Sequence, residues 1–99
     1  MKMIDDNKQK LNQICIDHNV KKLYLFGSIL TDKFKDDSDI DMLIQFSAMD
    51  LNNYFDNYMD FKEKMELLFN RSVDLAENQA IKNPIFRKVA DREKQLIYG

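Results

Sequence analysis

Residues 39–46 carry the pattern that most restricts how this chain can fold. Every second side chain there is apolar, and the side chains between them are polar except Leu43. The order is Asp39, Ile40, Asp41, Met42, Leu43, Ile44, Gln45 and Phe46. A period of two is typical of a strand with one face against a core. We therefore expect a strand over 39–46, with Asp39 and Asp41 together on its other face, next to the preceding loop.

A second apolar run comes shortly before this strand. Residues 20–26 are rich in apolar and aromatic side chains and predict a buried strand, which Gly27 ends. Ser28 is the predicted N-cap of a short helix over 29–33, and 33–38 reads as a polar loop. A strand that ends in glycine lets a phosphate approach the backbone, and a helix start offers free N–H groups. Gly27 and Ser28 are therefore predicted to bind a nucleotide phosphate.

The two aspartates suggest a metal site. Carboxylates at positions i and i+2 of a strand repel each other and favour a bound cation, and their hard oxygens suit Mg²⁺. A two-metal site, with ions roughly 3.5–4 Å apart, needs a further carboxylate. Asp74, in a third strand predicted over 71–76, is the best candidate. We predict Asp39, Asp41 and Asp74 as catalytic and metal-binding residues that together hold two Mg²⁺ ions.

The remaining elements are helical. We expect helices over 1–19 and 51–70, and a last helix that has Pro84 as its first residue. Residues 96–98 fit either a terminal strand or a continuation of that helix. An apolar stripe on the helix over 51–70 is interpreted as core, and its members are Leu51, Tyr54, Phe55, Tyr58, Phe61, Met65 and Leu68. The order predicts one α/β or α+β domain over 1–99, with helices packed on a small mixed sheet.

Simpler readings of the motif are a common Gly-Ser turn and a common Asp-rich loop. The spacing of Asp37, Asp39 and Asp41 also fits the first ligands of an EF-hand loop. That reading fails, because position six would be Met42 instead of glycine and position twelve would be Ala48 instead of glutamate.

Composition limits the classes of protein that fit. The 99 residues carry 15 basic and 17 acidic side chains, a net charge of −2, which is not the basic excess of a nucleic-acid binder. A single cysteine, Cys15, excludes an internal disulfide and a cysteine-rich zinc site, and lone His18 is no metal site. The polar N-terminus is unlike a signal peptide, and no apolar run is long enough to span a membrane. We expect a reduced, cytoplasmic protein with no membrane partner.

With these motifs in place, the chain resembles the minimal nucleotidyltransferases of the DNA polymerase beta superfamily. Their mark is Gly-Ser, about ten residues, Asp-x-Asp, and a third Asp on a later strand, matched here by Gly27-Ser28, Asp39-Ile40-Asp41 and Asp74. The resemblance is strong over 21–76. It implies a small mixed sheet, ATP as substrate and Mg²⁺ as cofactor.

Short members of that family are often antitoxins paired with a helical HEPN-type toxin. The resemblance therefore implies transfer of AMP from ATP to a hydroxyl of such a partner. The chain has no room for a separate substrate domain, so a partner would complete the site.

One departure from the family keeps alternatives open. Many relatives have a basic residue soon after Gly-Ser, whereas residues 29–32 here are Ile, Leu, Thr and Asp. Lys33, Lys35 or Arg71 could offset phosphate charge instead, although a solvated position fits each of them. One alternative is a non-catalytic protein that neutralises its partner by occlusion. Another is a transferase subunit that acts on a small-molecule or RNA acceptor bound elsewhere.

Overall fold

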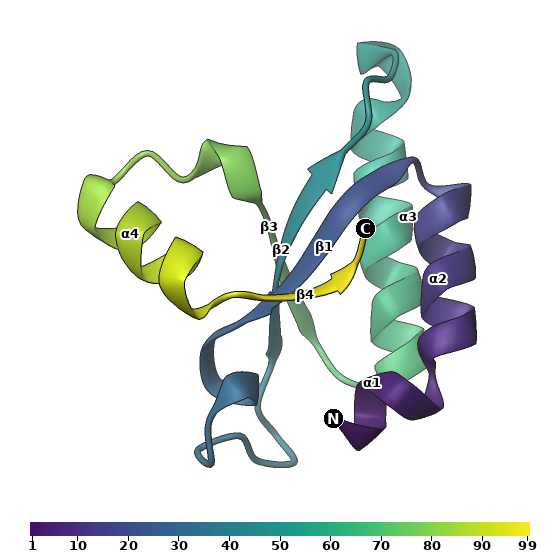
Figure 1. Ribbon diagram of the computed structural model, residues 1–99. Helices are drawn as coiled ribbons and strands as arrows, with labels where there is room; N and C mark the ends of the chain where they lie inside the picture. Colours follow the sequence, from purple (N-terminus) through teal and green to yellow (C-terminus); the bar gives the residue numbers. More distant parts are fainter.

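A four-stranded mixed sheet forms the centre of the molecule (Figure 1). The computed structural model describes residues 1–99. The strands lie in the order β3-β2-β1-β4, with bounds Val73–Glu77, Ile40–Phe46, Val20–Phe26 and Gln95–Tyr98. β1 is antiparallel to β2 and β4, and β2 is parallel to β3. The predicted α/β class with a small mixed sheet is confirmed.

Four α-helices and two short 3₁₀ helices accompany the sheet. The α-helices are α1 Lys2–Asp6, α2 Lys8–Asp17, α3 Leu51–Phe69 and α4 Pro84–Glu93, and the 3₁₀ helices are η1 Gly27–Leu30 and η2 Asn78–Ala80. α2 and α3 lie side by side against the sheet, whereas α4 stands away from them on the other side of the molecule (Figure 1). None of the helices combines the length and hydrophobicity needed to cross a membrane.

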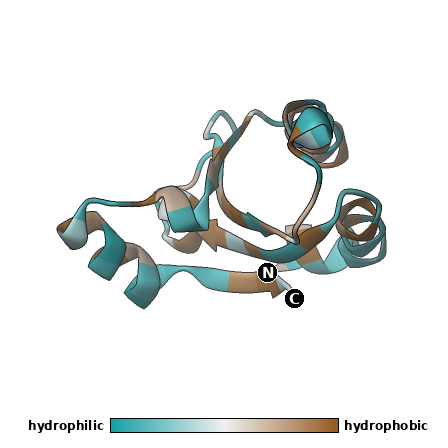
Figure 2. Ribbon diagram, turned by 90° about the horizontal axis from the view of Figure 1, so that it is seen from above, coloured by the Kyte–Doolittle hydropathy of each residue, from teal (hydrophilic) through white to brown (hydrophobic).

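The core lies between the sheet and the α2–α3 pair. Its largest fully buried side chains come from all of these elements and are Leu11, Cys15, Leu23, Leu25, Ile40, Met42, Ile44, Phe61 and Met65. Hydrophobic residues follow the strands in Figure 2, while α4 is mostly hydrophilic. Cys15 packs in this core, and burial raises the pKa of its thiol to about 12, so it is a packing residue.

The predicted core stripe of α3 is correct only in part. Phe61 and Met65 are fully buried, and the core also contacts Tyr54, Tyr58 and Leu68. Leu51 and Phe55 instead expose 86% and 69% of their surface. Both residues lie at the edge of the stripe and outside the face of α3 that packs on the core. Helical spacing alone therefore overestimated the width of the buried face.

The first helix is broken where a continuous one was expected. Asn7 separates α1 from α2, and its side-chain Nδ2 donates a hydrogen bond of 2.8 Å to the Met3 carbonyl. This local bond competes with helical backbone bonding, which is why asparagine is a weak helix former. α2 is followed by Asn19 in a left-handed conformation with φ 59°, directly before β1.

Two further predictions concern the C-terminal part. The helix with Pro84 as its first residue is confirmed, and Asn83 caps it by accepting hydrogen bonds from the N–H groups of Ile85 and Phe86. The open question of residues 96–98 is settled as a strand, because β4 pairs with β1.

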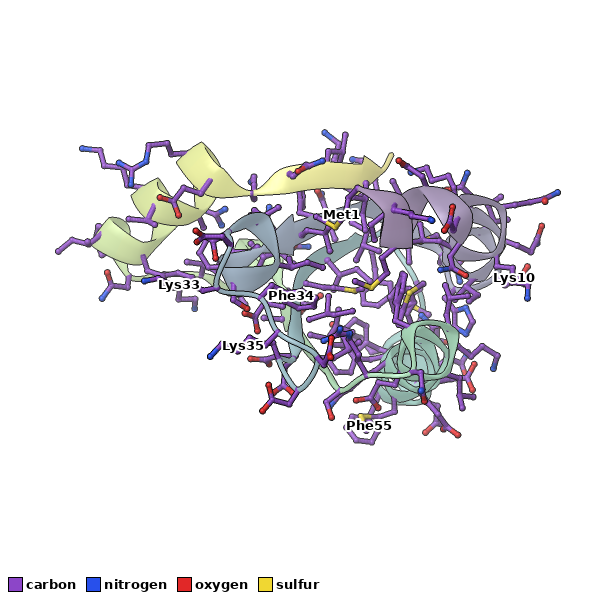
Figure 3. All side chains as sticks on the ribbon, turned by 90° about the horizontal axis from the view of Figure 1, so that it is seen from below. Met1, Lys10, Lys33, Phe34, Lys35 and Phe55 are labelled. Atoms are coloured by element: carbon purple, nitrogen blue, oxygen red, sulfur yellow. The ribbon has the colours of Figure 1, made fainter.

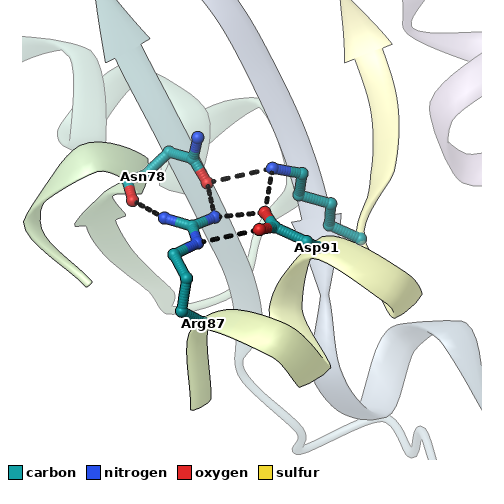
Figure 4. A network of polar contacts seen from close by, with 4 residues as sticks. Asn78, Arg87 and Asp91 are labelled. Atoms are coloured by element: carbon teal, nitrogen blue, oxygen red, sulfur yellow. Dashed lines mark hydrogen bonds and ion pairs between the residues drawn. The ribbon is translucent and has the colours of Figure 1, made fainter. Parts of the chain in front are cut away.

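A polar network ties α4 to the rest of the protein (Figure 4). The guanidinium of Arg87 donates to the Asp91 carboxylate and to the carbonyl and Oδ1 of Asn78, which follows β3. Lys94 donates to Asp91 at 2.8 Å, and its Nζ lies 4.4 Å from the centroid of the Tyr24 ring. Hydrogen bonds from Arg87 and Lys94 lower the pKa of Asp91 to about 2.

We expect this network to add stability that disappears in acid. Because the folded-state pKa of Asp91 lies below its ordinary value of 3.8, the contribution is complete above about pH 4 and is lost as pH falls towards 2. Asp91→Asn should therefore lower Tm at pH 6 and have a shrinking effect between about pH 4 and pH 3, measured by circular dichroism. Asp56→Asn, at an exposed aspartate of α3 without an ion pair, is the control. A Tm difference that stays constant over this range would contradict the assignment.

Candidate active site

β2 brings together residues from three strands at one end of the sheet. Asp41, its second residue, is the direct partner of Phe26 on β1 and of Asp74 on β3. The N–H of Ile40 donates a 2.9 Å hydrogen bond to the Ser72 carbonyl, which fixes the start of β2 against the start of β3. Direct partners in a parallel pair point to the same face, so Asp41 and Asp74 lie beside each other.

The three predicted carboxylates influence one another. Asp39 precedes β2 by one residue and is exposed, as is Asp74, whereas Asp41 is half-buried. Partial burial, followed by the negative charges of Asp74 and Asp39, raises the pKa of Asp41. Like charges this close favour a bound cation, which would relieve the repulsion.

The donor set fits a hard divalent cation without forming a finished cage. No group of three or more acidic, histidine or cysteine side chains is gathered closely enough to hold an ion by itself. Mg²⁺ does not need such a group, since it usually takes one or two carboxylates and completes its shell with water and phosphate oxygens. Asp41 and Asp74, with Asp39 at the rim, are the residues that could hold it.

Gly27 is shaped by its contact with Asp41. It ends β1 with φ +80°, a conformation that other residues rarely adopt. A Cβ atom at this position would lie 2.5 Å from Oδ2 of Asp41. The absence of a side chain therefore lets the turn after β1 sit directly against the carboxylate.

The predicted role of Ser28 as a helix N-cap is wrong. The helix over 29–33 is replaced by the four-residue η1, which already includes Gly27 and Ser28 and has no side-chain cap. The Ser28 carbonyl accepts from the N–H and the Oγ1 of Thr31, both at 2.9 Å. The helix expected to begin at Ile29, with free N–H groups at its start, is therefore absent. What remains near Ser28 is a small cavity lined by Gly27, Leu30, Thr31 and Glu93.

Arg71 holds the loop that leads to Asp39. Its Nη1 donates to the carbonyls of Lys35 at 2.6 Å and of Ser38 at 3.1 Å, and the guanidinium lies 4.4 Å from the centroid of the Phe34 ring. The guanidinium is therefore engaged by the loop and its side chain is 18% exposed, so the solvated position expected for Arg71 is wrong. Lys33 and Lys35 are exposed on the same loop (Figure 3).

An apolar cavity of about 270 Å³ adjoins the carboxylates. Its lining comes from β1, β2, β3, the segment before α4 and α4 itself, and comprises Phe26, Asp41, Met42, Leu43, Asp74, Ala76, Ile81 and Phe86. The rings of Phe26 and Phe86 meet edge to face, 5.6 Å between centroids. Sequence reasoning missed the roles of Phe86, Ile81 and Arg71, because no motif or periodicity connects them to the aspartates.

The close approach of Gly27 to Asp41 should make any side chain at position 27 destabilising. Gly27→Ala should destabilise the protein by about 1–3 kcal/mol, through a strained φ and a clash with Oδ2 of Asp41. In an Asp41→Ala background the clash is removed, and the same substitution should have a smaller effect, measured by urea unfolding. Equal losses in the two backgrounds would show that the close approach has no energetic effect.

Removal of the Arg71 anchor should loosen one loop and leave the fold intact. We expect Arg71→Met to lose hydrogen bonds worth about 1–2 kcal/mol in total, and so to speed Lys-specific proteolysis at Lys33 and Lys35 by about ten-fold. Arg92→Met, at an exposed arginine of α4, is the matched control. Unchanged cleavage of the loop in Arg71→Met would refute the anchoring role.

Sequence comparison now places the chain among known proteins. Residues 9–99 match the family described as polymerase beta, nucleotidyltransferase. Two relatives come from Methanocaldococcus jannaschii. The chain is 36% identical over 83 residues to "Putative protein adenylyltransferase MJ1379", which covers 82% of this chain and 78% of the relative. It is 30% identical over 82 residues to "Putative protein adenylyltransferase MJ0435", which covers 79% and 81%.

Comparison of structures agrees on the fold. A structure described as "Structure of putative minimal nucleotidyltransferase" has a TM-score of 0.76 at 21% identity and covers 95% of this chain and 92% of the other. One described as "Crystal structure of the toxin-antitoxin with AMP-PNP" has a TM-score of 0.69 at 19% identity, with 94% and 73% covered. The chain belongs to the polymerase beta nucleotidyltransferase family and has the minimal nucleotidyltransferase fold.

Proposed function

We propose that this protein transfers AMP from ATP to a hydroxyl group of a partner protein. The observation that carries the proposal is the pairing of Asp41 with Asp74 on adjacent strands, beside an apolar cavity and against the Gly27 turn. Membership of a nucleotidyltransferase family and two relatives named as protein adenylyltransferases support it.

In this proposal the turn after β1 binds the phosphates. Gly27 leaves its backbone open to a phosphate group, and the Ser28 hydroxyl can donate a hydrogen bond to a phosphate oxygen. Asp39, Asp41 and Asp74 would hold Mg²⁺, as two ions, which would supply stabilisation of the charge on the entering and leaving oxygens. The carboxylates thereby fix where the α-phosphate of ATP lies.

The transfer itself is an in-line displacement. The acceptor oxygen forms a bond to the α-phosphorus while the bond from that phosphorus to the bridging oxygen breaks, and pyrophosphate leaves. The acceptor proton passes to the carboxylate of Asp74. Asp74 suits this task because it is exposed on the strand next to Asp41 and borders the cavity from which an acceptor side chain can approach.

The proposed partner is a helical HEPN-type toxin, and the proposed setting is the cytoplasm. Similar folds occur in structures described as toxin–antitoxin pairs, one of them MntA-HepT, with a TM-score of 0.61 at 17% identity. In this proposal the acceptor hydroxyl belongs to that partner protein. Modification of the toxin by AMP would then neutralise it.

A second candidate function is neutralisation by occlusion without transfer. The observation in its favour is the lack of a cation at the Gly27 turn, whose cavity is lined by Leu30, Thr31 and Glu93. Arg71, which could have supplied charge, is engaged with the loop carbonyls. Under this alternative the carboxylates would be dispensable.

The test is label transfer from ATP labelled in its α-phosphate, with Mg²⁺ and a purified HEPN-type toxin as the acceptor protein. Asp39→Ala/Asp41→Ala should lower transfer on the order of a hundred-fold or more, because it removes two of the three carboxylates. Circular dichroism should show an intact fold, since the loss of mutually repelling charges removes no core contact. Asp36→Ala/Asp37→Ala, in the same loop, is the matched control and should transfer normally.

The same variants separate the two candidate functions. If Asp39→Ala/Asp41→Ala still rescues cells from the toxin, occlusion is sufficient and transfer is not the neutralising event. If rescue is lost while the complex still forms, transfer is required.

A further inference from the structure

α4 is joined to the protein by few contacts. Only Ala90 of its ten residues is buried, and the helix stands clear of the α2–α3 layer in Figure 1. It is held by the Arg87–Asp91 network and by the contact of Phe86 with Phe26. A ten-residue helix gains most of its stability from packing of an apolar face. Because α4 packs mainly through Ala90 and Phe86, most of its surface is available to another molecule.

The first turn of α4 exposes large apolar side chains. Ile85 exposes 77% of its surface and Phe86 exposes 44%. The open surface beside these residues is formed by α4 alone, through Pro84, Ile85, Arg87, Lys88, Val89, Asp91 and Arg92. Exposed aliphatic and aromatic side chains are typical of protein contact sites.

The same segment is basic in an acidic protein. Residues 82–94 contain five Lys or Arg and two Asp or Glu, a net charge of +3, whereas the whole chain carries −2 and the remainder therefore −5. Lys82 and Lys88 make no ion pair, and Arg92 pairs only with the neighbouring Glu93. The modest positive charge of this segment, in which Lys82 and Lys88 are unpaired, complements an acidic partner segment.

The α4 surface, defined as Lys82, Ile85, Phe86, Lys88 and Arg92, is continuous with the candidate active site. Phe86 contributes to the cavity wall together with Asp41 and Asp74. A molecule seated on α4 would thus have its side chains next to the carboxylates. Leu51 and Phe55, the exposed apolar residues at the start of α3, do not adjoin the candidate active site. Asp41 lies at the start of β2, whereas α3 begins after the other end of that strand.

We propose that the α4 surface docks an acidic, apolar segment of the acceptor protein and so presents its hydroxyl to Asp74. This inference rests on the proposed function and deepens it by naming the docking surface and the chemistry of the partner. A protein fits better than RNA, because the surface combines large apolar side chains with few free cations and the rest of the chain is acidic.

The experiment compares Lys88→Glu/Arg92→Glu with a charge-matched control, Lys10→Glu/Lys21→Glu, at exposed positions of α2 and β1 that form no ion pair. The probe is the HEPN-type toxin used above. Its Kd is measured by isothermal titration calorimetry, and KM values for the toxin and for ATP are measured by label transfer. We expect the α4 variant to raise the Kd and the KM for the toxin about ten-fold, with the KM for ATP unchanged. Ile85→Asp should have a similar effect, and the control should stay within two-fold of the wild type.

Each outcome decides a separate claim. Unchanged Kd and KM for the toxin in both α4 variants would overturn the docking inference and leave transfer standing. Binding without transfer by the wild-type protein would overturn the proposed function, while the Kd comparison would still decide the docking surface. Loss of toxin binding in Phe55→Asp but not in the α4 variants would place the interface on α3 and overturn the inference. Label found on RNA instead of on protein would also overturn it.

Discussion

The pairing of β2 with both of its neighbours is the constraint on which the rest of the structure depends. One face of β2 buries Ile40, Met42 and Ile44 against α2 and α3, and the pleat then forces Asp41 to the opposite face. There it meets the partners that register assigns to it, Phe26 and Asp74. A slip of one residue would turn the apolar set to solvent and separate the carboxylates. Hydrophobic burial therefore sets the geometry of the candidate site, although no site residue belongs to the core.

The site also opposes folding, because it gathers like charges. Partial burial and the charges of Asp74 and Asp39 raise the pKa of Asp41, which means that its ionised form is less favourable here than in water. The exposure of Asp39 and Asp74 limits this repulsion by leaving them hydrated. Gly27 has no side chain and therefore leaves room for the carboxylate of Asp41. Such local conflict with stability is typical of positions retained for binding or chemistry.

Local patterns predicted the elements whose cause is local. The alternation around Ile44 predicted β2, and the Asn83-Pro84 pair predicted the start of α4, because period and capping are properties of neighbouring residues. The same patterns could not show that Asn7 would break the first helix or that η1 would be a 3₁₀ turn. Arg71 and Phe86 lay beyond sequence reasoning for a different reason. Arg71 contacts a loop 33 to 36 residues away, and Phe86 reaches the site only because β4 returns to the sheet and places α4 beside β1. The aspartate motif therefore predicted the reacting groups far better than the walls around them.

α4 both lines the cavity beside the carboxylates and exposes a surface to solvent. Its inner side closes the cavity through Phe86, while its outer side keeps Ile85 exposed and the charge of Lys88 unpaired. α3 also exposes large apolar side chains, at Leu51 and Phe55, so exposure alone does not distinguish α4. What distinguishes α4 is that its exposed Ile85 lies next to Phe86 of the cavity wall and that Lys88 makes no ion pair, a combination that favours coverage by an acidic partner. An acceptor protein seated on this surface would lie beside Asp41 and Asp74, so the proposed transfer and the exposure of α4 have one common explanation.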